Sequence, residues 1–284
     1  MADTVVETSD RRWTVPEQYF ASLPWYDLPE IRDATDAFWR AIAAALQERG
    51  IADVPAALDR TLPYSMDFNS KCLFTQTCGY PLLTTSRSHF HVLGTPCYNA
   101  PGCAGPEHRA FIVARAASTF NSLEDLRGKT FAINELDSNS GMNLPRLLFA
   151  PLNHDGGFLG GRIITGSHAA SAEAVEAGEA DAASIDCVSF ALFQRYRPAA
   201  IKDLRILAET APTLAPPFVT SSRSELATIF TLREVLLEVM HDFRHVELRE
   251  ALLLDDVKLA GDDDYNTVLD YEREAKRLGY PVLV

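Results

Sequence analysis

The spacing of apolar and polar residues divides much of the chain into short strands that alternate with helices. Apolar runs at 110–114, 130–133, 161–165 and 182–185 predict buried strands. The last three are followed, after short connections, by helical spacing at 144–152, 170–177 and 188–196. Alternating strands and helices with short connections predict an α/β fold with a mostly parallel sheet.

The flanking regions show the same two kinds of pattern. Residues 22–27 predict a first strand, and apolar residues at helical spacing predict an amphipathic helix over 28–49 that ends at Gly50. Further strands are expected at 72–74, 90–94 and 218–220, an irregular loop at 95–106, and one or two helices over 225–254. The first 20 residues are polar and are expected to be peripheral.

Composition narrows the class of protein. With 284 residues, 47% of them apolar, the chain has enough length for a substantial core and for two lobes. The formal net charge is -13, and no stripe or arm rich in Lys and Arg is present, so nucleic acid is not an expected partner. No apolar run is long enough to cross a bilayer, which predicts no direct insertion into a membrane.

The N-terminus bears on the compartment. Residues 1–12 lack a basic start followed by an apolar core, so they do not resemble a secretory signal. Taken as it stands, the sequence predicts a cytoplasmic protein. A chain whose leader had been removed would instead be periplasmic.

The cysteine and histidine spacings predict neither a cofactor nor a metal site. The five cysteines are an odd number at spacings unlike a secreted disulfide framework, although one bridge is compatible with them. Two pairs are each separated by five residues, which is wider than the ligand spacing of structural zinc. His241 and His245 lack the accompanying Glu of a metalloprotease helix, which favours a solvated helix face.

The segment after the strand at 130–133 carries the first candidate for a binding site. Ser138, Asn139, Ser140 and Gly141 combine hydroxyl groups, a backbone that a ligand can approach closely, and the free N–H groups of a helix N-terminus. Together these groups can hold an anion. Ser and Asn are also favoured N-cap residues, so an ordinary helix cap is the alternative.

Two further polar positions follow the next strands. Ser167 and His168 stand before the helix at 170–177, where they can face a ligand or cap the helix. Asp186 follows the strand at 182–185. Its carboxylate can accept a hydrogen bond from a ligand at this edge of the sheet, or it can cap the next helix, and both roles are compatible.

The N-terminal half offers candidates for the opposite wall of the site. Tyr26 ends the predicted first strand, and Gln76 and Thr77 follow the apolar run at 72–74. These positions are typical of ligand contacts at the ends of strands in an open α/β sheet. Packing of Tyr26 against the core and a solvated polar turn at Gln76 are the alternatives.

Three segments, 122–143, 166–168 and 174–186, resemble the phosphate/phosphonate substrate-binding proteins of ABC transporters. Members of that family carry a Ser-x-Ser-Gly loop at a helix N-terminus and a following Ser-His pair. These motifs are matched here by Ser138, Ser140, Gly141, Ser167 and His168. The resemblance implies that these residues face the ligand. Many members carry Ser-Thr-Ser where this chain has Ser-Asn-Ser.

The resemblance also implies the two-lobed α/β fold of the type II periplasmic binding proteins. It predicts one lobe over 1–112 and 213–284, a second over 113–212, two crossing strands at 110–114 and 204–210, and a ligand cleft between the lobes. Closure of the lobes would capture a small polar, anionic ligand such as a phosphonate for an ABC transporter permease.

A cytosolic enzyme of lyase, decarboxylase or transferase type on the same scaffold is the alternative function, and a cytosolic ligand sensor is another. In the enzyme interpretation, a thiolate at Cys78 or Cys187 near His168 would act as a nucleophile. The sequence shows no nucleophile elbow, phosphate-loop motif or metal triad, and it assigns no catalytic residue.

Overall fold

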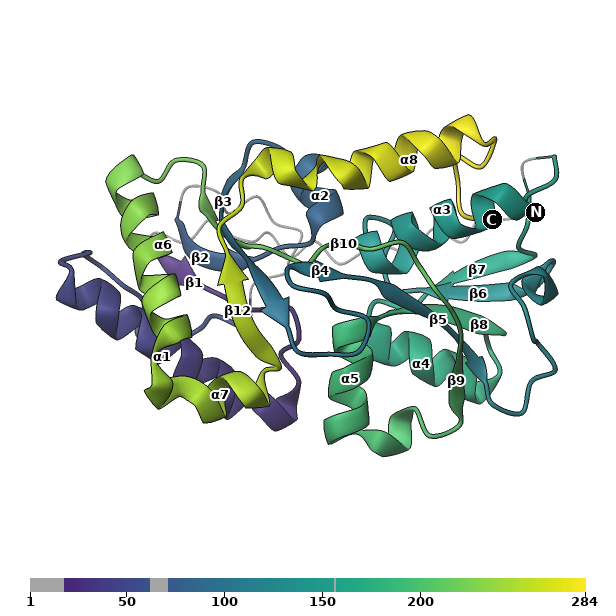
Figure 1. Ribbon diagram of the computed structural model, residues 1–284, viewed down its shortest axis with the longest axis horizontal. Coiled ribbons are helices and arrows are strands. Elements are labelled where there is room, and N and C mark those ends of the chain that lie inside the picture. Colours follow the sequence, from purple (N-terminus) through teal and green to yellow (C-terminus); the bar gives the residue numbers. More distant parts are fainter. Residues whose placement is uncertain (1–17, 62–70, 156) are drawn as a thin grey trace, which may run out of the picture.

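The computed structural model describes residues 18–61, 71–155 and 157–284, which form two lobes side by side along the long axis of the molecule (Figure 1). Each lobe is built on a five-stranded sheet, and a two-stranded ribbon lies between them. The predicted two-lobed α/β architecture is confirmed. The expectation that the first 20 residues are peripheral falls almost entirely outside the described residues.

The sheet of the first lobe is anchored to its helices by aromatic side chains. Its strands, in spatial order, are β1 (Phe20–Ala21), β2 (Cys72–Gln76), β11 (Phe218–Ser221), β3 (Phe90–Tyr98) and β12 (Leu254–Lys258). Helices α1 (Arg32–Glu48), α6 (Leu226–His241) and α7 (Val246–Ala251) cover it, and α2 (Gly79–Leu83) follows β2. The Phe74 ring lies 5.7 Å from that of Trp39 in α1 and 5.3 Å from that of Phe218. Such ring pairs fix the helix to the sheet.

The second lobe follows the predicted alternation closely. Its strands, in spatial order, are β7 (Gly161–Ile164), β6 (Thr130–Ile133), β8 (Ala182–Asp186), β5 (Ala110–Arg115) and β9 (Leu204–Glu209). Its helices are α3 (Leu144–Phe149), α4 (His168–Ala177) and α5 (Cys187–Tyr196). Strands β6, β7 and β8 pair in parallel, and β5 runs antiparallel to both β8 and β9. Two of its four pairings are therefore parallel, and the sheet is mixed rather than mostly parallel as predicted, because β5 runs against both of its neighbours.

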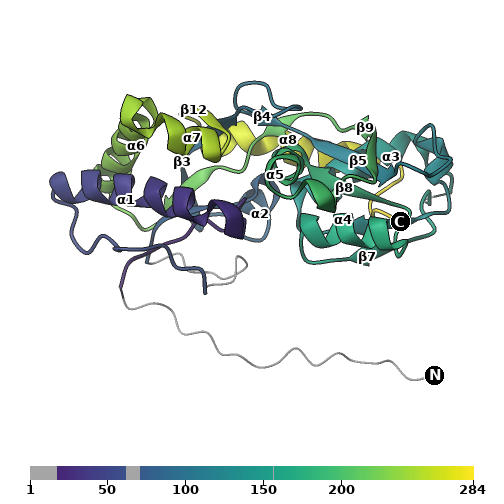
Figure 2. The ribbon, with the colours of Figure 1, turned by 90° about the horizontal axis from the view of Figure 1, so that it is seen from below.

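A short ribbon carries the chain between the lobes. Strands β4 (Glu107–His108) and β10 (Thr213–Leu214) pair antiparallel, and β4 lies in the middle of the molecule in both views (Figures 1 and 2). The predicted crossing segments 110–114 and 204–210 are strands β5 and β9 of the second sheet, and β5 is buried over 110–114. The crossings occur just before β5 and just after β9.

The end of the chain joins the two lobes a third time. Helix α8 (Thr267–Arg277) contacts both α2 and α3 (Figure 1). Beyond it, the carbonyl oxygens of Leu283 and Val284 accept hydrogen bonds from Arg162 at 2.8 Å and from the Phe158 N–H at 3.0 Å. The division of the chain at residues 112 and 213 stays a prediction, but its last residues lie against the second lobe.

Three local predictions were wrong. Residues 22–27 form a loop rather than a strand, because pairing with β2 ends at Ala21 and the chain turns at Tyr26, which has φ 62°. The expected loop at 95–106 begins as strand, since β12 pairs with the second half of β3. Helix was expected to run to 254, but α7 ends at Ala251 and Leu253, with φ 55°, turns the chain into β12.

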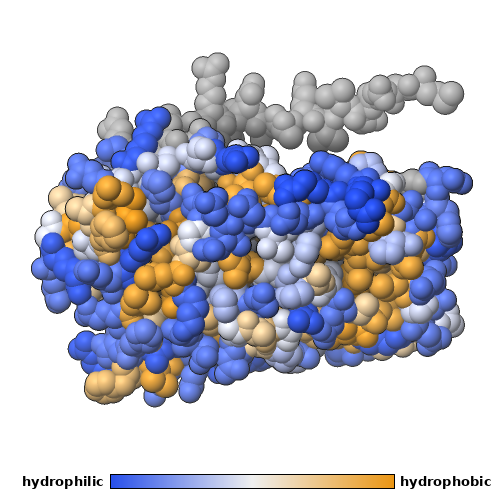
Figure 3. Space-filling model, turned by 45° about the horizontal axis from the view of Figure 1, so that its top comes forward, coloured by the Kyte–Doolittle hydropathy of each residue, from blue (hydrophilic) through white to orange (hydrophobic). Residues whose placement is uncertain are grey.

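The surface is mixed in character. Figure 3 shows a largely hydrophilic face interrupted by separate apolar patches. Among the described residues, Leu226, Phe230 and Phe243 are the most exposed large apolar side chains. Within the described part of the chain, no helix combines the length and apolar character needed to cross a membrane.

Candidate functional site

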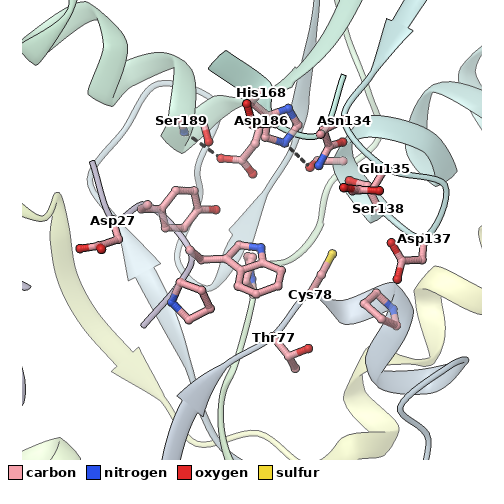
Figure 4. Close-up of a pocket in the computed structure, with 18 of the residues that line it drawn as sticks. Asp27, Thr77, Cys78, Asn134, Glu135, Asp137, Ser138, His168, Asp186 and Ser189 are labelled. Atoms are coloured by element: carbon pink, nitrogen blue, oxygen red, sulfur yellow. Dashed lines mark hydrogen bonds between the residues drawn. The ribbon is translucent and has the colours of Figure 1, made fainter. Parts of the chain in front are cut away.

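A cavity of about 780 Å³ lies between the two lobes (Figure 4). The first lobe lines it with the loop 24–28, with parts of segment 77–89 and with Pro216. The second lobe contributes residues from 134–140, 166–169 and 186–193. The carboxyl ends of β6 and β8 and the starts of α4 and α5 therefore meet the first lobe across one space, which is where open α/β sheets bind ligands.

The Ser138–Asn143 segment forms a single turn of π-helix before α3. The Ser138 hydroxyl accepts a hydrogen bond from the Gly141 N–H at 2.9 Å, and the Asn143 N–H donates to the Ser138 carbonyl oxygen at 3.0 Å. All five residues of the turn, 139–143, are buried. Turns of this kind are frequent at functional sites. The capping role of Ser138 is thus present, while Ser138 and Ser140 also line the cavity.

Gly141 serves the site by making room for a neighbour. A Cβ atom at this position would lie only 1.8 Å from Oδ1 of Asn134 and 3.1 Å from Oγ of Ser138. Asn134, at the end of β6, itself lines the cavity, and its buried Oδ1 has no hydrogen-bond partner among the described residues. The glycine therefore lets an unsatisfied polar side chain pack against the turn.

His168 connects the π-turn to α4. Its Nε2 lies 3.1 Å from Oγ of Ser140, and the ring lines the cavity. Burial lowers the pKa of His168, and the nearby charge of Asp186 opposes this effect only in part. The neutral ring is therefore favoured at neutral pH. Next to it, Ser167 caps α4 by accepting a hydrogen bond from the Ala170 N–H at 3.1 Å.

Asp186 forms a buried pair with a histidine from the ribbon. Its Oδ2 lies 2.6 Å from Nδ1 of His108, and its Oδ1 accepts a hydrogen bond from the Ser189 N–H at 2.9 Å. Burial favours the protonated acid, but the charge and hydrogen bond of His108 outweigh it and lower the pKa of Asp186. Asp186 thus caps α5 and lines the cavity at once (Figure 4).

The predicted first-wall residues divide into two groups. Tyr26 and Thr77 line the cavity, and the buried Tyr26 hydroxyl has no hydrogen-bond partner among the described residues. Burial raises the pKa of Tyr26 well above its usual value, so the hydroxyl keeps its proton. Gln76 lies behind the wall, where its amide donates to Tyr98 Oη at 3.0 Å and to the Pro216 carbonyl at 2.8 Å.

Asn139 and Gly141 also lie behind the lining. The Asn139 amide donates to Oγ1 of Thr213 in β10 at 2.9 Å, and its backbone N–H donates to Sγ of Cys78 at 3.4 Å. These contacts tie the π-turn to the ribbon and to the first lobe. The structure therefore brings seven of the ten predicted residues onto the cavity wall: Tyr26, Thr77, Ser138, Ser140, Ser167, His168 and Asp186.

Several lining residues were not predicted as ligand contacts, among them Trp25, Asn134, Asp137 and Ser189. Asn134 carried a usable signal, because it directly follows the strand at 130–133 and so lies at the carboxyl edge of the sheet. The position of Ser189 in the first turn of α5 was a comparable signal. No sequence signal indicated Trp25 as a ligand contact, because the first strand was predicted to include this residue.

The charge of the cavity wall is negative. Among the described residues that line it are four carboxylates and no Lys or Arg. Asp27 is paired with Arg60 at 2.7 Å. Glu135 and Asp137 lie beside one another (Figure 4), and burial together with the charge of Asp137 raises the pKa of Glu135. Within the described residues, no group of three or more His, Cys, Asp or Glu side chains is placed to hold a metal ion.

The two cysteines of the enzyme interpretation lie in unreactive surroundings. Cys78 lines the cavity, but burial raises the pKa of its thiol to about 11. Cys187 is fully buried, and its Sγ lies 3.5 Å from that of Cys103, a contact that together with burial raises its pKa further. Because the thiolate is the nucleophile, neither residue is set up for covalent catalysis at neutral pH.

Two lobes joined by a short ribbon, with a cavity between them, are the architecture of the periplasmic-binding-protein class. A family model described as "ABC transporter, phosphonate, periplasmic substrate-binding protein" matches residues 74–265. The chain belongs to this family, and the predicted resemblance is confirmed. Its members are periplasmic proteins by that description. No curated protein matches the chain in sequence.

Solved structures of the same fold bind different ligands. A binding protein component of a phosphonate ABC transporter from Pseudomonas aeruginosa is 18% identical with a TM-score of 0.73, over 92% of this chain and 88% of that one. PhnD1 from Prochlorococcus marinus in complex with methylphosphonate is 15% identical with a TM-score of 0.73, over 92% and 98%. A Xanthomonas citri protein bound to ATP is 18% identical with a TM-score of 0.68, over 93% and 98%. These likenesses confirm the type II fold, and the enzyme alternative is not favoured.

Proposed function

We propose that the cavity between the lobes binds an oxyanion-bearing small molecule and that the protein presents it to an ABC transporter permease in the periplasm. The observation that carries the proposal is the position of the π-turn at 138–143. Its two serine hydroxyls face a cavity that the first lobe closes with Thr77. Family membership supports the transport role.

The donors for the oxyanion come from both lobes. Ser138, Ser140 and His168 stand on the second lobe, and the Thr77 and Tyr26 hydroxyls stand on the first. A neutral His168 can donate through one ring nitrogen, as hydroxyl groups do. A ligand held by both lobes stabilises the closed arrangement by its differential affinity for that state. Hydroxyl and imidazole donors bind an oxyanion without a fixed positive charge, which agrees with a wall that lacks Lys and Arg among its described residues.

Calorimetric titration of the purified protein with phosphate, methylphosphonate and phenylphosphonate tests this proposal. We expect at least one oxyanion to bind, and the Ser140→Ala/His168→Ala variant to weaken that binding at least tenfold, because the hydrogen-bonded pair on one wall and its free donor are removed. The variant Ser118→Ala/His241→Ala, which removes the same groups away from the cavity, is the matched control. No heat from any oxyanion, or unchanged affinity in the first variant, would contradict the proposal.

A further inference from the structure

The two ends of the cavity differ in chemistry. Figure 4 shows Glu135, Asp137 and Ser138 on one side of the space and Asp27 and Ser189 on the opposite side. The first side carries the hydroxyl groups of the π-turn. Apolar side chains of the loop 24–28 and of α5 also line the cavity.

Helix α5 supplies one apolar wall. Leu192 and Phe193 lie three and four residues after Ser189, so all three share one face of the helix, and all three line the cavity. Both apolar side chains are almost fully buried against the core of the lobe. Their positions are therefore fixed by packing rather than by a ligand.

The loop 24–28 supplies the facing wall. Trp25 and Leu28 line the cavity on either side of Asp27, and both side chains are only partly buried. The Asp27 carboxylate between them is held by Arg60 at 2.7 Å and by Arg32 at 3.5 Å. Because its charge is already paired, this end of the cavity presents an indole ring and aliphatic carbon rather than a free ion.

The size of the cavity exceeds the need of a small oxyanion. One water molecule takes up about 30 Å³, so the cavity of 780 Å³ has the volume of roughly 26 water molecules. Methylphosphonate has the volume of roughly five water molecules. Trp25, Leu28, Leu192 and Phe193 are the large apolar side chains among the residues that line the cavity, besides Tyr26. A ligand that leaves the remaining space empty forfeits contacts with these side chains and the burial of the apolar surface that Trp25 and Leu28 still expose.

We propose, resting on the proposed function, that the ligand is an oxyanion with an apolar substituent at least as large as a phenyl ring, bound between the loop 24–28 and α5. The oxyanion lies at the π-turn, and the substituent lies between Trp25 and Leu28 on one side and Leu192 and Phe193 on the other. The substituent carries no further negative charge. Glu135 and Asp137 lie on the side where the oxyanion binds, so each further negative charge on the ligand adds to their repulsion, and no described lining residue is a Lys or Arg that could offset it.

A set of three probes on the full chain tests the inference. We expect phenylphosphonate to bind at least tenfold more tightly than methylphosphonate, which is about 1.4 kcal/mol, and ATP to bind more weakly than phenylphosphonate. Trp25→Ala and Leu28→Ala, measured separately, are each expected to reduce the phenyl-to-methyl affinity ratio at least threefold. Phe243→Ala removes an aromatic ring that is 82% exposed and distant from the cavity lining, so it is the matched control and should leave the ratio unchanged.

The outcomes separate the two proposals. Equal affinity for both phosphonates would overturn the apolar subsite while leaving oxyanion binding at the π-turn intact. Tighter binding of ATP than of phenylphosphonate would also overturn it, because the negative wall would then tolerate a polyanion. Failure of all three probes to bind would overturn the proposed function and the subsite with it. Circular dichroism shows whether each variant is folded, and Leu28→Ala keeps the test decisive should Trp25→Ala unfold.

Discussion

The contact between Gly141 and Asn134 leads to a sharp prediction about stability. In Gly141→Ala, the new Cβ would stand 1.8 Å from Oδ1 of Asn134, whereas Cβ contacts below 3.0 Å are essentially never tolerated. The amide oxygen must therefore retreat by more than about 1 Å, within a wall where the same Cβ also meets Oγ of Ser138 at 3.1 Å. Such overpacking costs about 2 kcal/mol, a fall in Tm of roughly 4–8 °C.

Thermal unfolding followed by circular dichroism measures this loss, and two further variants isolate its cause. Gly161→Ala is the matched control, because a Cβ there has no atom within 4 Å and the residue does not need a positive φ. Its Tm should change by less than about 1 °C. In an Asn134→Ala background, Gly141→Ala should cost about 1 kcal/mol less than in the parent, since the clashing oxygen is gone. The same loss in both backgrounds would refute the explanation.

Three further predictions concern titratable groups of the site. Because burial lowers the pKa of His168, the unfolded chain binds a proton at this residue more readily than the folded chain does, so His168 destabilises the fold as pH falls below about 6.5. The loss of Tm between pH 7 and pH 5 should therefore be smaller in His168→Gln than in the parent. An identical loss in both proteins would contradict this prediction. Asp186→Ala leaves His108 without its buried partner and α5 without its cap, and should cost about 3 kcal/mol in urea unfolding. Ser167→Ala, which removes only the cap of α4, should cost about 1 kcal/mol. Equal losses would show that the contact with His108 adds nothing. With a pKa of about 11, about a thousandth of Cys78 is thiolate at pH 8. Iodoacetamide should therefore alkylate Cys78 far more slowly in the folded protein than in the urea-unfolded chain, as measured by peptide mass spectrometry. Equal rates of alkylation would contradict the burial of Cys78.

The second lobe could be predicted closely from the sequence. Strands β6 and β8 lie within a residue of the predicted 130–133 and 182–185. Strands covered on both faces produce unbroken apolar runs, which are easy to distinguish from their polar surroundings. Strand β12 was missed because Leu254–Lys258 buries only Leu254 and Val257, so it lacks the unbroken apolar run or strict alternation that predicts a strand.

The site could be predicted only where local sequence determines it. Hydroxyl groups at helix starts, such as Ser138 and Ser167, are visible in the sequence because capping is a local interaction. The pair of His108 and Asp186 joins residues that are 78 positions apart, and it exists because β5 pairs with β8 in a register that sets Ala110 opposite Asp186. The contact of Asn134 with Gly141 depends on the π-turn, which contains one residue more than a turn of α-helix. No local sequence pattern predicted that additional residue.

The third link between the lobes has a mechanical consequence. Two bodies joined by a ribbon of two short strands could both bend and twist about it. Helix α8 and the final residues, fastened to the second lobe through Leu283 and Val284, act as a strut beside that ribbon. Two attachments that run side by side resist twisting of one lobe against the other far more than they resist bending about the line that joins the attachments. We therefore expect the lobes to open and close about a single axis, so that each closure returns the two cavity walls to the same register.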